Sequence, residues 1–207
     1  RQPDQTELEY QMRNWYYFNW LCGDHIDEQH IHNLDVMNWL FQGFPVSANG
    51  MGGRQVRTSN LHGEIFDHHF VEFTYSDGSK MYSQCRHAPG CFNRVGEEVH
   101  GTKGKGGVAS RARGASPYDQ EHADLVEAIR KNKVFNEGYY GATSSMTAAL
   151  GRLANYSGKE ITWEDAVSKG VSELPKVLAW DAPAPVQKDE SGDYPIPIPG
   201  LYDPFVS

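Results

Sequence analysis

The spacing of apolar side chains predicts helices at both ends of the chain. A helix is expected over residues 7–16, and a second over about 26–41, where Leu34, Met37 and Leu40 help to form a buried stripe at helical intervals. Two more amphipathic helices are predicted over residues 117–131 and 139–156. Thr162 is predicted to be the N-cap of a further helix, with Asp165 at the capping-box position.

Between these helices, a period of two predicts strands. Residues 67–75 place His69, Val71, Phe73 and Tyr75 on one face, and Ser76-Asp77-Gly78-Ser79 is typical of a hairpin turn into a partner strand over residues 80–87. Further strands are expected over 46–57, with a bulge possible at Gly52-Gly53, over 92–102, and around 107–111. Hairpins followed by helices favour an α+β fold with an open-faced, predominantly antiparallel sheet and helices packed on one face.

Length and composition narrow the class of protein. A chain of 207 residues suits one domain over residues 1–207, in which six prolines predict an extended tail over 181–207. A net charge of −8 argues against nucleic-acid binding, and no apolar run approaches a membrane span of about 20 residues. Arg1 begins no signal peptide, which leaves the compartment open. Three cysteines without a CxxC pair favour free thiols, although Cys85 and Cys91 are close enough in sequence to pair.

The densest group of titratable residues lies between Asp24 and Asp35. In a single helix, Glu28, His32 and Asp35 share one side at intervals of four and three residues. A carboxylate four residues before an imidazole can orient the ring and raise its basicity, which suits proton transfer near neutral pH. A solvated helical Glu–His pair explains the same spacing equally well.

Several motifs give the chain a family resemblance. The segment Gly23-Asp24-His25-Ile26-Asp27-Glu28-Gln29-His30-Ile31-His32-Asn33-Leu34-Asp35 resembles the G-G-x-x-x-D-x-x-x-H-x-x-D helix of the Gfo/Idh/MocA oxidoreductases, in particular their bacterial NADH-dependent dehydrogenase-like branch. Segments 50–55, 83–86, 101–104 and 156–163 continue the resemblance in order. The G-x-G-x-x-G turn of a Rossmann domain and the family's Glu-Lys-Pro motif do not occur.

The resemblance implies that this chain is the C-terminal, substrate-facing domain, with the sheet of a dihydrodipicolinate-reductase-like C-terminal domain and without the Rossmann domain that mainly binds NAD or NADP. It implies His32 as the general base toward a sugar, cyclitol or glycoside hydroxyl. Glu28 occupies the family's Asp position, and its role is either substrate contact or ring orientation. It also implies a homodimer or homotetramer formed through the open sheet face, and a bacterial source, in the periplasm or the cytoplasm.

Further residues are candidates for substrate binding. Asp24 and His25 replace a small pair of the family motif, and Asp35 is its second acidic position, which either contacts substrate or supports the helix. Gln84 and Arg86 share a predicted strand face with Tyr82, and binding of sugar hydroxyls and contact with another subunit explain this face equally well. Two other functions stay open. One is a metal-dependent lyase or hydrolase with His25, Glu28, His30 and His32 as ligands. The other is a non-catalytic carbohydrate-binding or assembly domain.

Overall fold

The computed structural model describes residues 1–107 and 116–206. They form two compact units, one from Arg1–Phe92 with Ser144–Ser207 and the other from Asn93–Thr143. The expectation of one domain over residues 1–207 stays a prediction.

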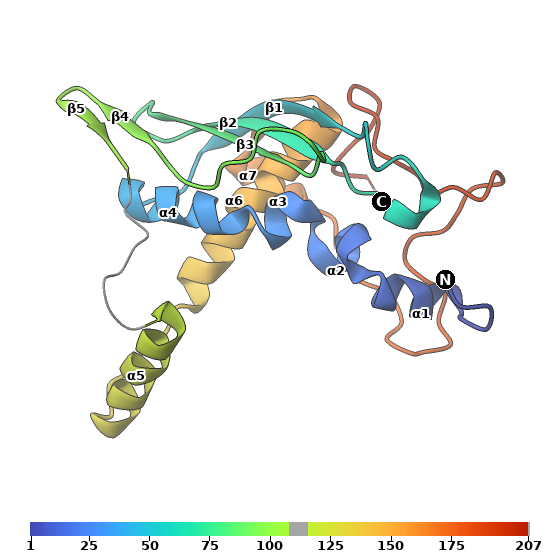
Figure 1. The fold of residues 1–207 in the computed structure, drawn as a ribbon, viewed down its shortest axis with the longest axis horizontal. Coiled ribbons are helices and arrows are strands. Elements are labelled where there is room, and N and C mark those ends of the chain that lie inside the picture. Colours follow the sequence, from blue (N-terminus) through green and yellow to red (C-terminus); the bar gives the residue numbers. More distant parts are fainter. Residues whose placement is uncertain (108–115, 207) are drawn as a thin grey trace. The chain divides into compact units, whose positions relative to one another are not determined.

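The larger unit is built on a four-stranded antiparallel sheet with the strand order β3-β2-β1-β6 (Figure 1). Its strands are β1 (Ser47–Gly53), β2 (His68–Thr74), β3 (Lys80–Arg86) and β6 (Ile161–Thr162). The alternation predicted for residues 67–75 is present in β2, where His69, Val71 and Phe73 are buried. The turn at residues 76–79 joins β2 to β3, as expected.

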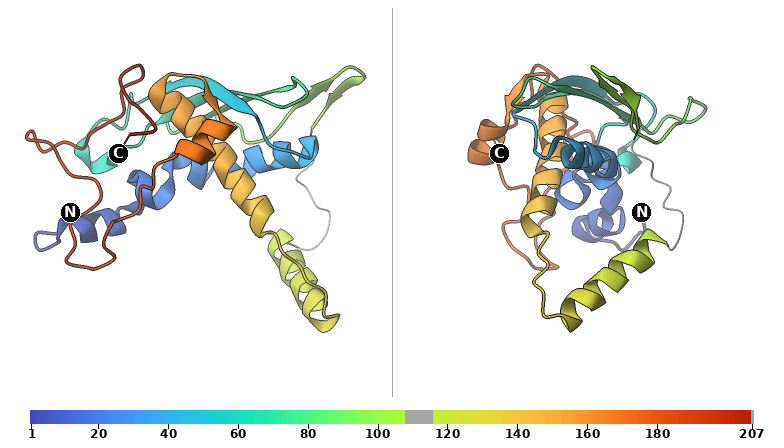
Figure 2. Two further views of the ribbon diagram at one scale, coloured as in Figure 1. Left: turned by 180° about the vertical axis from the view of Figure 1, so that it is seen from behind. Right: turned by 90° about the vertical axis from the view of Figure 1, so that its left-hand side faces the viewer.

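Helices cover one face of this sheet, and the other face is left open (Figures 1 and 2). The helices packed against the sheet are α3 (Asp24–Glu28), α4 (Ile31–Phe41), α6 (Gly138–Ser157) and α7 (Trp163–Lys169). Helices α1 (Glu7–Arg13) and α2 (Asn19–Cys22) contribute instead to a second apolar cluster around Tyr10, Phe18 and Tyr194. The main core lies between the sheet and α3, α4 and α6, and includes Ile26, Leu34, Phe73 and Leu150. The predicted α+β fold with an open antiparallel sheet is therefore confirmed.

Gly151 lets α6 pack closely against the core. A Cβ atom at this position would lie 2.7 Å from Cζ of Phe73 and 3.1 Å from Cδ1 of Ile26. Because both neighbours are fully buried, neither has free space into which to move. The absence of a side chain at residue 151 therefore sets the distance of α6 from β2 and α3.

The helix ends follow local capping chemistry. Thr6 and Glu9 form a capping box at the start of α1, which ends at Arg13 rather than at the predicted residue 16. The Thr162 hydroxyl accepts a hydrogen bond from the Asp165 backbone N–H at 3.1 Å, so Thr162 caps α7 as predicted.

The single helix predicted over residues 26–41 is wrong. It is divided into α3 and α4, with the break at Gln29 and His30. The backbone N–H groups of both residues donate to the same carbonyl, that of His25. Their side chains contact residues in and after β3, since His30 bonds Ser83 at 2.7 Å and Gln29 bonds His87 at 2.9 Å. These tertiary contacts coincide with the break.

Strand β1 is shorter than the predicted 46–57 and has no bulge, because its register with β2 runs residue for residue from Ser47 to Gly53. The smaller unit contains the hairpin of β4 (Val99–Gly101) and β5 (Gly104–Gly106), followed by α5 (Pro117–Arg130). The strand expected around residues 107–111 lies mostly outside the described residues.

The proline-rich segment 181–206 forms neither helix nor strand. Among the described residues, no helix has both the length and the apolar character needed to cross a membrane.

Candidate functional site

Asp24 is the centre of a buried polar cluster at the start of α3. Gly23 and Asp24 both have a φ of +71°, a conformation that aspartate tolerates better than most residues. Asp24 Oδ1 accepts from the His25 backbone N–H at 2.5 Å, while Oδ2 accepts from the Phe66 N–H at 2.9 Å and from the Tyr156 hydroxyl at 2.5 Å. These donors fix the orientation of a carboxylate that has no exposed surface.

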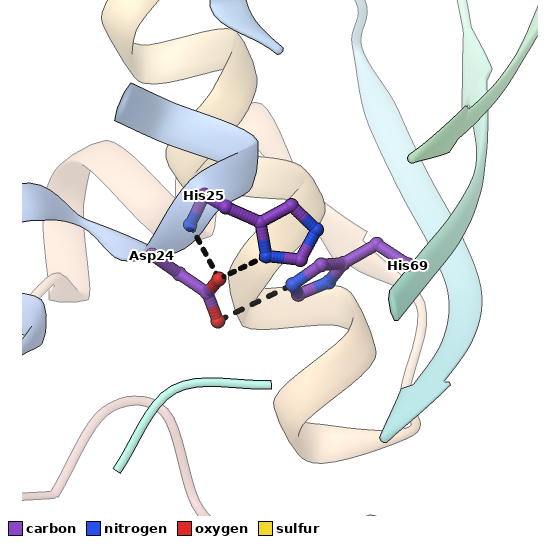
Figure 3. Close-up of side chains that lie close together, drawn as sticks. All are labelled: Asp24, His25 and His69. Carbon is purple, nitrogen blue, oxygen red and sulfur yellow. Dashed lines mark hydrogen bonds and ion pairs between the residues drawn. The ribbon is translucent and has the colours of Figure 1, made fainter. Parts of the chain in front are cut away.

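Two imidazoles converge on the same carboxylate (Figure 3). Nδ1 of His25 lies 2.8 Å from Oδ1 of Asp24, and Nε2 of His69 lies 3.2 Å from Oδ2. His25 comes from α3 and His69 from β2, and their ring centroids are 4.8 Å apart. Both side chains are buried, with 2% and 3% of their residue surface exposed.

The second ring nitrogen of His69 contacts α6, since Asn155 Nδ2 lies 2.9 Å from His69 Nδ1. The Asn155 side chain reaches this position by passing over β1. A Cβ atom at Gly50 would lie 2.3 Å from Asn155 Oδ1, so any other residue at position 50 would displace it. The glycine-rich part of β1 therefore makes room for the residue that orients His69.

The electrostatics of the cluster are dominated by this carboxylate. Burial alone raises the pKa of Asp24, but the neighbouring His69 and His25 rings lower it well below its usual range. Burial lowers the pKa of His30 to about 4, with a smaller effect from His25 and His69. His30 is thus a neutral structural histidine, bonded to Ser83.

The structure separates the two residues predicted to be catalytic. Glu28 lies in α3 and His32 in α4, so the predicted spacing along one helix does not hold. Glu28 is partly buried, and its Oε2 has no partner among the described residues. His32 is exposed, and no hydrogen bond or ion pair joins it to the rest of the described chain. Their catalytic roles stay predictions.

The residues predicted to bind substrate lie in three places. Asp24 and His25 are in the buried cluster, and Asp35 accepts a hydrogen bond from the Ser144 hydroxyl at 2.5 Å, which links α4 to α6. Gln84 and Arg86 lie on the open face of the sheet, where the Arg86 guanidinium donates to the Phe92 carbonyl at 2.9 Å. Because the buried cluster lies under the opposite face, the structure does not assemble these five residues into one site.

Sequence reasoning missed a second polar group, beside the buried cluster. Nε2 of His87 lies 2.9 Å from both the Tyr16 hydroxyl and Gln29 Oε1. The His87 ring meets His25 edge-on at 4.9 Å. Burial, followed by repulsion from His25, lowers the pKa of His87 to about 4. Partly exposed His87 thus lies between the cluster and the surface of the domain.

The proposed metal ligands His25, Glu28, His30 and His32 do not form a group in the structure. Among the described residues, the acidic, histidine and cysteine side chains close enough to share an ion are Asp24, His25 and His69. Cys22, Cys85 and Cys91 are free thiols, and burial raises the pKa of Cys22 to about 12.

These features define an α+β domain with an open sheet, helices on one face, and a buried polar cluster contributed by α3 and β2. Residues 2–148 match the sequence profile described as "Oxidoreductase family, C-terminal alpha/beta domain". The chain belongs to the Gfo/Idh/MocA oxidoreductase family, as its C-terminal domain. A search of curated proteins found no match.

Solved structures share the fold at low identity. Aldose-aldose oxidoreductase from Caulobacter crescentus, complexed with glycerol, is 13% identical with a TM-score of 0.55, covering 78% of this chain and 52% of that one. Myo-inositol dehydrogenase from Corynebacterium glutamicum is 18% identical with a TM-score of 0.53, covering 72% and 51%. The enzyme from Lactobacillus casei, in complex with NAD(H) and myo-inositol, is 16% identical with a TM-score of 0.50, covering 64% and 45%. The chain thus spans about half the length of these proteins.

Proposed function

We propose that this chain is the substrate-facing domain of an NAD(P)-dependent oxidoreductase that acts on a sugar, cyclitol or glycoside by hydride transfer at a carbinol carbon. The observation that carries the proposal is membership of the family over residues 2–148. The solved relatives add to it, since the one from Lactobacillus casei is a complex with NAD(H) and myo-inositol and the one from Caulobacter crescentus is a complex with glycerol.

His32 is the proposed general base. Its imidazole is exposed on α4 and engaged by no other described group, so it is available to a hydroxyl presented from outside the domain. It takes the hydroxyl proton as the carbinol carbon loses hydride. The nicotinamide, when bound, accepts that hydride. The dinucleotide is held mainly by a nucleotide-binding domain outside these 207 residues, and the isolated domain is therefore inactive.

Glu28 is the proposed partner in this reaction. Its Oε2 atom is buried without a hydrogen bond from any described residue, which costs free energy unless another group donates one. The two roles proposed for Glu28 are therefore contact with a substrate hydroxyl and orientation of the His32 ring. The Asp24 cluster is shielded from solvent and does not touch the substrate in this proposal.

The open sheet face is the proposed contact between copies of the chain. Met51, Phe70 and Tyr82 expose 72%, 40% and 64% of their surface there, and the Phe70 and Tyr82 rings stack at 6.4 Å. Apolar side chains gathered on one face favour association into a homodimer or homotetramer. Gln84 and Arg86 then lie at this contact rather than in a substrate pocket.

The test uses the protein in which this domain is joined to its nucleotide-binding domain. NADH formation is measured with a panel of cyclitols, aldoses and glycosides. His32→Ala is expected to lower turnover by at least about 100-fold with little change in the Kd for NADH, because a general base contributes about 10²–10⁴-fold. His122→Ala, which changes an exposed histidine of α5, is the matched control. Unchanged turnover in His32→Ala would remove His32 as the base.

A further inference from the structure

The Asp24 cluster has the composition of a metal site. One carboxylate oxygen and one nitrogen from each of two imidazoles lie within 4.8 Å of one another. Two histidines with one carboxylate form a ligand set typical of divalent first-row transition metals, including Zn²⁺. The three residues come from α3 and β2, so an ion held by them would tie the helix to the sheet.

The ring nitrogens that face the carboxylate form close contacts that do not meet the geometry of a hydrogen bond. Nδ1 of His25 and Nε2 of His69 are fully buried and have no hydrogen-bond partner among the described residues, although they lie only 2.8 and 3.2 Å from the Asp24 oxygens. Nitrogen lone pairs directed at a common point beside the carboxylate would produce the same distances.

The spacing of the ligand atoms can be compared with that of a zinc site. Zn²⁺ binds nitrogen and oxygen ligands at about 2.0–2.2 Å, which places neighbouring ligand atoms of a tetrahedral site about 3.3 Å apart. His25 Nδ1 lies 2.8 Å from Oδ1 of Asp24, His69 Nε2 lies 3.2 Å from Oδ2, and one ligand atom from each residue lies within 4.8 Å of the others. Binding of one ion therefore requires the three side chains to shift until both nitrogens and one carboxylate oxygen reach this spacing.

Neighbouring groups are placed to support metal ligands. The Tyr156 hydroxyl and the Phe66 N–H hold Oδ2 of Asp24, as groups around a metal-bound carboxylate commonly do. Asn155 lies against Nδ1 of His69, and with its amide turned over, its oxygen would accept the Nδ1 proton of a ring that binds metal through Nε2.

The buried carboxylate also needs a counter-charge. The buried guanidinium of Arg152 is engaged by other acids, with Glu173 at 3.0 Å and Asp27 at 3.9 Å. Within the described parts of the chain, the ion-pair contacts of Asp24 are those with the two imidazoles, which are cationic only if they are protonated. Either a proton shared among these groups or a metal ion supplies the charge.

We propose that Asp24, His25 and His69 bind one divalent transition-metal ion, with Zn²⁺ as the ion favoured by the ligands, and that this ion has a structural role in joining α3 to β2. The site is distinct from the proposed base His32 and does not depend on the proposed oxidoreductase activity. Its burial places the ion out of contact with substrate.

The test uses the complete 207-residue chain, unfolded and then refolded either with Zn²⁺ or with a chelator, so that burial does not block entry of the ion. After removal of free metal, the bound zinc is counted by mass spectrometry, and Tm is measured for both preparations. The expected result is about one Zn²⁺ per chain and a higher Tm for the zinc-loaded protein, because a ligand that binds only the folded state stabilises it. Refolding with Co²⁺ should give visible ligand-field absorption.

Variants locate the ion. His69→Gln and Asp24→Asn are expected to lower the affinity for Zn²⁺ by at least about tenfold, whereas His30→Gln, which changes a partly buried histidine outside the ligand set, should retain it. The wild-type comparison of the two refolded preparations does not depend on whether any variant folds. Refolded wild type without bound zinc, with identical Tm in Zn²⁺ and chelator, would overturn the proposal and assign the counter-charge to a proton. Equal loss of zinc in all three variants would also overturn it.

Discussion

Replacing Tyr156 by phenylalanine tests the description of the buried cluster. The substitution removes the hydroxyl that donates to Asp24 Oδ2 at 2.5 Å and keeps the ring that packs against Phe66. A hydrogen bond to a charged group contributes about 1.5–3 kcal/mol, more than the roughly 1 kcal/mol of a neutral one. With no exposed surface on Asp24, water cannot replace the lost donor. We therefore expect Tyr156→Phe to lower the free energy of unfolding by about 2–3 kcal/mol at pH 7.

The pKa of Asp24 sets the pH range over which this effect is present. The pKa of Asp24 is lowered in the folded protein, so the stability from its ionised form is present at neutral pH and is lost as the pH falls below the unfolded value of about 4. Removing a donor to the ionised form raises the folded pKa. The difference between Tyr156→Phe and wild type should therefore stay constant while Asp24 is ionised in both folded proteins, and shrink only where the pH falls below the folded pKa of the variant.

The assay is urea unfolding followed by tryptophan fluorescence across this pH range. Tyr75→Phe is the matched control, because its buried hydroxyl donates to the neutral Asn38 amide oxygen at 2.9 Å. The control should lose about 1–2 kcal/mol, with no change in this difference between pH 7 and pH 3. If Tyr156→Phe unfolds at the wild-type urea concentration at pH 7, or if it loses no more stability than Tyr75→Phe, the charged hydrogen bond does not have the role described here.

Two further predictions concern packing and pH. Gly151→Ala should destabilise the protein by about 1–2 kcal/mol in urea unfolding, because the new methyl group meets Phe73 and Ile26 and the cost of overpacking exceeds the gain in helix propensity. Gly141→Ala is the control in the same helix: a methyl group there meets open space, so the variant should be neutral or more stable by up to about 1 kcal/mol. Burial raises the pKa of Glu64 to about 7, so its contribution to stability is greatest below pH 4.5 and is lost as the pH rises through 7. The free energy of unfolding of Glu64→Gln should therefore rise relative to that of wild type between pH 5 and pH 8, by up to about 3 kcal/mol. The same difference between the two proteins at both pH values would contradict this.

The sheet could be predicted from sequence because its signals are local. Alternation in β2 and the Ser76-Asp77-Gly78-Ser79 turn specify the hairpin register, and proline content identifies the irregular segment 181–206. The same alternation placed His69 on a face with Val71 and Phe73, which was the available sign that this histidine is buried.

The site was harder to predict because its residues meet through the fold. The break between α3 and α4 coincides with contacts from Gln29 and His30 to Ser83 and His87, more than 50 positions away in sequence. No helical period can encode such contacts. Likewise, Tyr156 and Asn155 reach Asp24 and His69 only because α6 packs beneath the sheet.

The most direct test of the proposed function follows the hydrogen at the carbinol carbon. The protein carrying this domain together with its nucleotide-binding domain is incubated with NAD and a polyol or glycoside substrate deuterated at that carbon. Hydride transfer predicts that deuterium appears on the nicotinamide ring of the NADH formed, and that turnover is slower than with the unlabelled substrate where this step limits the rate. Conversion of the substrate with the deuterium still in place, at an unchanged rate and with none in the nucleotide, would contradict the assignment of this chain to an oxidoreductase of sugars, cyclitols or glycosides.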